Sequence, residues 1–323
     1  MRGGAAREAF EFEFDRLVLD DRACTNLRLD PRLGLYAGRL HPRQGSASLG
    51  VFTDACPDRW RRLLMRRRLE REQRACIAAK AVRLVESDYL LGVRDAFRVE
   101  ALRFRRDDAG DFLDNQHDVA APPFIQLREL EAGSMALKRD VDNTDAHGDD
   151  WLRMLIAPGR RLHFASAMTL TGRQDGDDAS TGASYLEIAR VLIDHGAQTD
   201  IDLQELWSRI VFNLMVSNTD DHLRNHGFIL VPGKGWRLSP AFDMNPVPHA
   251  QGLKLNISQA DNALDLDLAR AVAPYFRVSV RDADGIIGRC LTVVRQWRTI
   301  AAHVGVRAQE QDFMAAAFRL ASV

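Results

Sequence analysis

The sequence predicts an α+β protein, with a mixed α/β N-terminal part and a mainly helical C-terminal lobe. Three observations predict this class. Apolar residues recur at helical spacing through most of the second half, and short strand-like runs bounded by Gly, Pro and Asp occur in the first half. One two-stranded hairpin interrupts the helical part. The 323 residues favour two domains over one.

The composition is that of an ordinary globular protein, with 46% hydrophobic and 28% charged residues. A net charge of −1 excludes recruitment of nucleic acid or membrane by an overall field. No apolar run reaches 18 residues and MRGGAAREAF lacks a hydrophobic signal segment, so we expect a cytoplasmic protein. The four scattered cysteines form no CxxC pair, which favours buried thiols.

The first half predicts short elements. The stretch AFEFEF alternates Phe10, Phe12 and Phe14 with acidic residues, which is typical of a half-buried strand. Residues 57–76, PDRWRRLLMRRRLEREQRAC, predict a basic helix, whose charges more often form a solvated face than a contact to nucleic acid or protein. ALRFRRDDAGDFL, residues 101–113, predicts a hairpin. The predicted domains are residues 1–115, a linker with a truncated start of the next region at 116–160, and a helical lobe at 161–323.

Two helices lead into the central hairpin. SYLEIARVLIDHG opens with a capping box of Ser184 and Glu187 and stops at Gly196. DLQELWSRIVFNLMVSN has a wide apolar stripe from Leu203 to Met215 and ends near Ser217, which is typical of a central helix. Further helices are predicted over 265–276, 281–303 and 308–320.

A polar loop, NTDDHLRN, follows the central helix and carries Asp220 and Asn225. Residues 228–231 then predict a strand, PGKG a turn and WRLS a second strand. Asp243 follows in PAFDMNP, so the hairpin would return it beside the polar loop.

Phosphoryl transfer needs a carboxylate that orients the attacking hydroxyl and oxygen ligands for Mg²⁺. Protein kinases supply these as Asp, an Asn five residues later, and an Asp beyond a hairpin. This order predicts Asp220 as base, with Asn225 and Asp243 as metal ligands.

Two other interpretations of the loop stay open. Polar residues are common where a helix ends, and capping alone would explain Asn218 and Thr219. A zinc site would use His222 and His226 at helical spacing, although the run lacks the glutamate of an HExxH motif. The remaining candidates, His163, His195 and His249, are expected at the surface or in packing.

At this point the residues resemble a known family, the HipA-like serine/threonine kinases, which are toxins of bacterial type II toxin–antitoxin modules. FNLMVSNTDDHLRNHGFIL and GWRLSPAFDMNPVP carry the resemblance most specifically. LHFASAMTLTG, ASYLEIARVL and DLQELWSRIVFN extend it. DACPDRWRRLLMRR, ESDYLLGVRD, EALRFR and PPFIQLRELE resemble the N-terminal subdomain of the family. The resemblance covers most of the chain and implies a protein-kinase-like fold, with residues 161–323 as its C-lobe.

The resemblance also implies roles for residues. The catalytic Asp of the family falls on Asp220 and its metal-binding Asp on Asp243, with Phe242 beside the nucleotide. Contacts to nucleotide and metal fall on His222, Leu223, Arg224 and Asn225. The implied cofactors are ATP and Mg²⁺. The implied partners are a small helix-turn-helix antitoxin (HipB-like) and a protein substrate, an aminoacyl-tRNA synthetase being a known target class. DNA would be bound only through the antitoxin, and no membrane is involved.

The chain departs from the family pattern in one place. MLIAPG runs directly into RRLHFASA, where the family has a Gly-rich phosphate loop, a strand with the ATP-binding lysine and a hinge segment. None of the four lysines (Lys80, Lys138, Lys234 and Lys254) follows a Gly-rich turn, and DGDDASTGA is acidic. Two hypotheses follow: a kinase whose activity is weakened or lost with its nucleotide lobe, or a non-catalytic remnant that binds an antitoxin-like partner.

Overall fold

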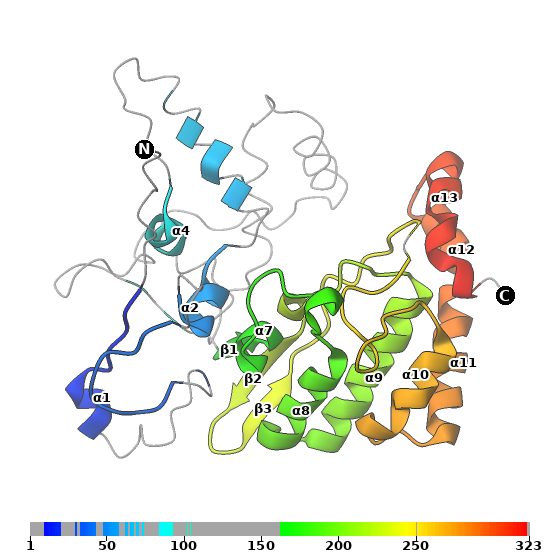
Figure 1. The fold of residues 1–323 in the computed structure, drawn as a ribbon. Coiled ribbons are helices and arrows are strands. Elements are labelled where there is room, and N and C mark those ends of the chain that lie inside the picture. Colours follow the sequence, from blue (N-terminus) through cyan, green and yellow to red (C-terminus); the bar gives the residue numbers. More distant parts are fainter. Residues whose placement is uncertain are drawn as a thin grey trace. The chain divides into compact units, whose positions relative to one another are not determined.

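The computed structural model describes residues 10–20, 33–42, 48–57, 84–92, 162–249 and 251–321, with single positions at 30, between 62 and 73, and at 102 and 104. The chain divides into two compact units (Figure 1). The first unit comprises residues 1–12 and 39–163, and the second comprises 13–38 and 164–323. The predicted hairpin, apart from Leu102 and Phe104, and the predicted linker at 116–160 lie outside the described residues.

The first unit is described through two short helices, α2 (Gly50–Ala55) and α4 (Glu86–Leu91). Ala55, Cys56 and Leu90 are buried together, with Phe10 and Phe104 packed against them. The described positions between 62 and 73 are helical, in agreement with the predicted basic helix. There Arg62 makes a two-point ion pair with Glu86, at 2.6 and 2.9 Å.

The predicted strand at Phe10–Phe14 forms only one isolated antiparallel bridge, between Phe12 and Leu40. The alternation of burial is as predicted, since Phe14 is buried while Glu11 and Glu13 are exposed. A ladder does not develop, because Asp15 begins a turn into α1 (Arg16–Asp20) and the backbone leaves the extended conformation. The period-two pattern identified the buried face but not the length of the element.

The second unit contains a three-stranded antiparallel sheet in the order β1-β2-β3. The strands are β1 (Phe164–Ser166), β2 (Gly227–Val231) and β3 (Gly235–Leu238). Phe228 pairs with Leu238 and Val231 with Gly235, so β2 and β3 form the predicted hairpin. The turn needs Gly233, whose φ of +72° favours glycine. The mixture of helices with a small sheet confirms the α+β class.

Between β1 and β2 the chain forms the helices α7 (Ala167–Thr171), α8 (Tyr185–His195) and α9 (Thr199–Met215). The capping box predicted for α8 is present, because the Glu187 carboxylate accepts from the backbone N–H of Ser184 at 3.2 Å. Gly196 ends the helix as predicted. The 17 residues of α9 make it the longest helix among the described residues.

Helix α9 is the centre of the second unit. It contacts α8 and β3 as well as the helices that follow the hairpin (Figure 1). Its apolar stripe is fully buried: Leu203, Leu206, Trp207, Ile210, Val211, Leu214 and Met215. The apolar spacing therefore predicted both the helix and its central place. This burial fixes the end of α9, from which the polar loop departs.

The C-terminal helices are α10 (Leu266–Val272), α11 (Val280–Val294), α12 (Trp297–His303) and α13 (Ala308–Met314), with 3₁₀ turns η5 (Ala273–Phe276) and η6 (Ala315–Ala321). The single helix predicted over 281–303 is wrong, since the chain breaks between α11 and α12. At the break Trp297 stacks on Phe318 at 4.2 Å, and Arg295 donates to the Ala321 carbonyl. Contacts to η6 thus compete with a straight continuation of the helix.

No described helix has the length and apolar character needed to cross a membrane.

Hydrogen bonds to Asp178, from within the segment and from Lys254, hold the acidic segment between α7 and α8. Asp178 accepts from the Ser180 hydroxyl at 2.5 Å and from its backbone N–H at 2.9 Å, and the Lys254 ammonium donates to it at 2.9 Å. The Ser180 hydroxyl, then Lys254, lower the pKa of Asp178 from 3.8 to about 2. The segment includes the 3₁₀ turn η3 (Ala179–Thr181).

Trp207→Phe should lower the free energy of unfolding by about 1–3 kcal/mol, because it leaves a cavity and removes the hydrogen bond from the indole N–H to the Ala269 carbonyl, 2.9 Å long. Urea unfolding measures this. Ile201→Ala, at a position on α9 that is 60% exposed, is the matched control and should change stability by less than about 0.5 kcal/mol. Equal losses in both variants would contradict the central place of this helix.

Asp178→Asn should destabilise the protein at pH 7, because the folded state lowers the pKa of this carboxyl and so binds its proton less tightly than the unfolded state. The contribution is complete above about pH 4 and is lost as the pH falls towards 2. Urea midpoints of both proteins between pH 7 and pH 3 measure it. A difference that stays constant over this range would show that the carboxylate charge has no part in holding the segment.

Candidate active site

The polar loop begins where α9 ends. Ser217 adopts a positive φ of +51°, which reverses the chain, and its hydroxyl donates to the Ala317 carbonyl at 2.8 Å. The backbone N–H of Asn218 donates to the Asn213 carbonyl at 2.8 Å. A short 3₁₀ turn, η4 (Leu223–Asn225), then leads into β2, with Leu223 buried in the core. The loop is therefore anchored at both ends by packed elements.

Asp220 and Asn225 face each other across this loop. The Asn225 side-chain Nδ2 donates to the Asp220 backbone carbonyl at 3.2 Å, which closes the five-residue span. Asn225 is buried, whereas Asp220 is exposed. Because its nitrogen is already used, the Asn225 amide can offer its oxygen to a cation. The Asp220 carboxylate is open to an incoming group.

The hairpin returns Asp243 to the same place, as the sequence predicted. The Asn218 side-chain Nδ2 donates to the Asp243 backbone carbonyl at 3.4 Å. Asp243 has a φ of +56°, a conformation that Asp tolerates better than most residues, and its side chain is exposed. Its carboxylate accepts from the Asn245 amide at 2.5 Å.

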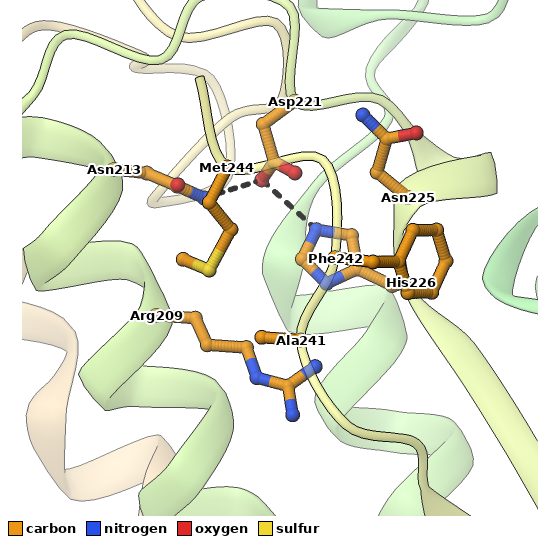
Figure 2. A pocket seen from close by; sticks show the side chains of 8 residues that line it. All are labelled: Arg209, Asn213, Asp221, Asn225, His226, Ala241, Phe242 and Met244. Atoms are coloured by element: carbon orange, nitrogen blue, oxygen red, sulfur yellow. Dashed lines mark hydrogen bonds and ion pairs between the residues drawn. The ribbon is translucent and has the colours of Figure 1, made fainter. Parts of the chain in front are cut away.

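Asp221, which sequence reasoning passed over, is the buried centre of the site (Figure 2). Its Oδ2 accepts from the Tyr185 hydroxyl at 2.5 Å, from Asn213 Nδ2 at 2.7 Å and lies 2.9 Å from His226 Nε2. The residue is 2% exposed. A buried carboxylate requires such donors, because an unpaired one would cost several kcal/mol. No signal in the sequence separates it from Asp220, because its partners Tyr185 and Asn213 come from earlier elements of the chain.

The hydrogen bond to Asp221 also affects the ionisation of Tyr185. Burial, together with the Asp221 carboxylate that accepts a hydrogen bond from its hydroxyl, raises the pKa of Tyr185 well above its usual value of 10. The hydroxyl therefore stays a hydrogen-bond donor at physiological pH. Its ring also contacts His226 edge-to-face, with 5.5 Å between the centroids.

A pocket lies between α9, the polar loop and the segment after β3 (Figure 2). It is lined by Arg209, Asn213, Asp221, Asn225, His226, Ala241, Phe242 and Met244. The space measures about 170 Å³, open solvent included. Pockets for drug-sized ligands are typically about 300–1,000 Å³, so these residues alone do not enclose a nucleotide.

Three more predicted residues border the site. His222 is half-buried at the start of η4. Arg224 lies 3.7 Å from the Asp175 carboxylate, so it is directed towards the acidic segment. Phe242 is 41% exposed and its ring lies 6.5 Å from that of Phe164. The structure thus joins Asn225 to the Asp220 backbone and the polar loop to the Asp243 backbone, and Phe242 lines the same pocket as Asn225.

The donor set fits a magnesium ion that is also held by phosphate oxygens. Mg²⁺ is commonly bound by one or two carboxylates together with substrate phosphates, and Asn225 and Asp243 offer that set. The described residues contain no group of three or more His, Cys, Asp or Glu side chains able to hold a metal ion. The zinc alternative is therefore wrong for this part of the chain, because His226 is buried against Asp221 and the loop is not a helix.

Comparisons with known proteins identify the family. The model of the HipA-like C-terminal domain matches residues 130–298, just over half of the chain. The chain belongs to the HipA-like family. No curated protein matches the sequence. Among solved structures, a similar chain comes from the Shewanella oneidensis MR-1 toxin–antitoxin system HipA, HipB and operator DNA complex. It is 17% identical, with a TM-score of 0.40 over 51% of this chain and 44% of that chain. The HipA-like chain therefore matches less than half the length of that relative.

Asp221→Ala should destabilise this HipA-like protein by about 3 kcal/mol or more, because three buried donors lose their common acceptor. Tyr185→Phe removes one donor and should cost only about 1 kcal/mol. Thermal or urea unfolding compares the two variants. If Asp221→Ala cost no more than Tyr185→Phe, the carboxylate would not be the centre of this network.

Proposed function

We propose that this HipA-like protein has a kinase-type catalytic site for phosphoryl transfer from ATP to a protein serine or threonine. The observation that carries the proposal is that Asp220 and Asn225 share a loop at the end of a buried helix, and that the hairpin returns the Asp243 backbone to this loop. Asn225 reaches the backbone of Asp220, and Asn218 links the loop to Asp243. The α+β fold would then be of the protein-kinase type.

The residues of the site would have different roles. Asp220, exposed at the loop, would orient a substrate hydroxyl and accept its proton. Asn225 and Asp243 would hold Mg²⁺, which when bound would neutralise the charge of phosphate oxygens. His222, Leu223, Arg224 and Phe242 would border the nucleotide.

We further propose that catalysis is weak or absent, because the chain lacks a Gly-rich loop and an ATP-binding lysine. Lys234 lies exposed in the β2–β3 turn, and Lys254 pairs with Asp178. The junction between MLIAPG and RRLHFASA lies almost wholly outside the described residues. One electrostatic group at a developing charge is typically worth about 10²–10³ in rate, so the loss of several would leave little activity.

The family suggests the partners. A HipB-like helix-turn-helix antitoxin would bind the chain, and operator DNA would be contacted only through it. This is supported by the similar HipA chain, whose complex contains HipB and operator DNA. The protein would act in the cytoplasm on a protein such as an aminoacyl-tRNA synthetase. In the alternative function, a non-catalytic remnant, only the antitoxin-like partner remains.

Calorimetry with Mg²⁺ and ATP distinguishes the two functions. A kinase-type site should bind MgATP with micromolar affinity, and Asp243→Ala should abolish that binding, because a metal ligand is lost. Asp312→Ala, which removes an exposed carboxylate of α13, is the matched control and should bind as the unchanged protein does. Absence of detectable MgATP binding would contradict the kinase and leave the antitoxin-binding remnant.

A further inference from the structure

A continuous line of buried side chains connects the two halves of the site. Asn213 Nδ2 donates to the Asp221 carboxylate at 2.7 Å, the step drawn in Figure 2. Asn213 Oδ1 in turn accepts from Asn218 Nδ2 at 3.1 Å. The same Asn218 nitrogen reaches the Asp243 backbone carbonyl at 3.4 Å. The line therefore begins at the neighbour of Asp220 and ends at Asp243.

The direction of each amide in this line is determined by the carboxylate. Asp221 is an acceptor, so Asn213 must present its nitrogen there and its oxygen to Asn218. Asn218 must then direct its Nδ2 towards the Asn213 oxygen. The same Nδ2 is the donor to the Asp243 backbone carbonyl. Asn213 and Asn218 are both fully buried, where a hydrogen bond is electrostatically stronger than in water.

A purely structural role explains the second amide poorly. Asn218 Oδ1 is buried and has no hydrogen-bond partner among the described residues. An unpaired buried acceptor costs about 1–3 kcal/mol, and an apolar side chain of the same shape would avoid that cost. The amide nitrogen, however, supplies the contact to Asp243, which has a positive φ and is otherwise exposed.

We propose that Asn213 and Asn218 are positioning residues that link the Asp221 carboxylate to the Asp243 backbone through consecutive hydrogen bonds. They hold the metal-binding carboxylate beside Asp220, although neither amide touches metal or substrate. The metal part of this inference rests on the proposed function. The link between Asp221 and Asp243 does not depend on it.

A double-mutant cycle read by NMR tests the link without any metal. Asp221→Asn should shift the backbone amide signals of residues 242–245. In an Asn218→Leu background the same change should shift them at least about threefold less, because the line is cut. Asn256→Leu removes another buried amide, which bonds the Ala179 carbonyl at 2.9 Å, and in that background the shift should be unchanged. Equal shifts in all three backgrounds would overturn the proposal.

Mn²⁺ affinity, measured by electron paramagnetic resonance, tests the positioning role. Asn218→Leu should weaken binding by about tenfold or more, as is typical when a residue behind a metal ligand is lost, while Asn256→Leu should stay within about twofold. Unchanged affinity in Asn218→Leu would overturn the role. If Asn218→Leu does not fold, Asn218→Asp removes the same donor at nearly the same size. If the unchanged protein does not bind Mn²⁺, the proposed function fails, and the NMR cycle still decides the link.

Discussion

The buried carboxylate of Asp221 is the interaction on which the site depends. It joins α8 through Tyr185, α9 through Asn213 and, through His226, the residue that precedes β2. A charge at this depth is tolerated only because donors from three separate elements converge on it. The loop between them is consequently held at its middle as well as at its ends, and Asp220 is left exposed next to a fixed point.

The core and the site depend on each other. Burial of Trp207 and its neighbours fixes α9 against the C-terminal helices, and α9 presents Asn213 from its last turns. The hairpin then returns the chain by a turn that requires Gly233 at positive φ. Helix α9 and the β2–β3 hairpin contain none of the three proposed catalytic residues. Together, however, they place the Asp243 backbone beside the polar loop.

Much of this arrangement could be predicted from the sequence, because its causes are local. The capping box of Ser184 and Glu187, the apolar stripe of α9 and the hairpin were all visible as spacing. The break between α11 and α12 was not, since it depends on Trp297 meeting Phe318 from a distant part of the chain. The role of Asp221 could not be predicted either. Asp220 is exposed and Asp221 is buried because Asp221 bonds to Tyr185 of α8, 36 positions earlier.

The central claim is that Asp220, Asn225 and Asp243 form one cation site on the HipA-like lobe. Paramagnetic broadening of backbone amide signals during a Mn²⁺ titration tests it most directly. The account predicts that signals of residues 220–225 and 242–245 broaden together at the lowest Mn²⁺ concentrations, before those of the acidic segment 175–178. Broadening that begins at the acidic segment, or at only one of the two loops, would contradict it.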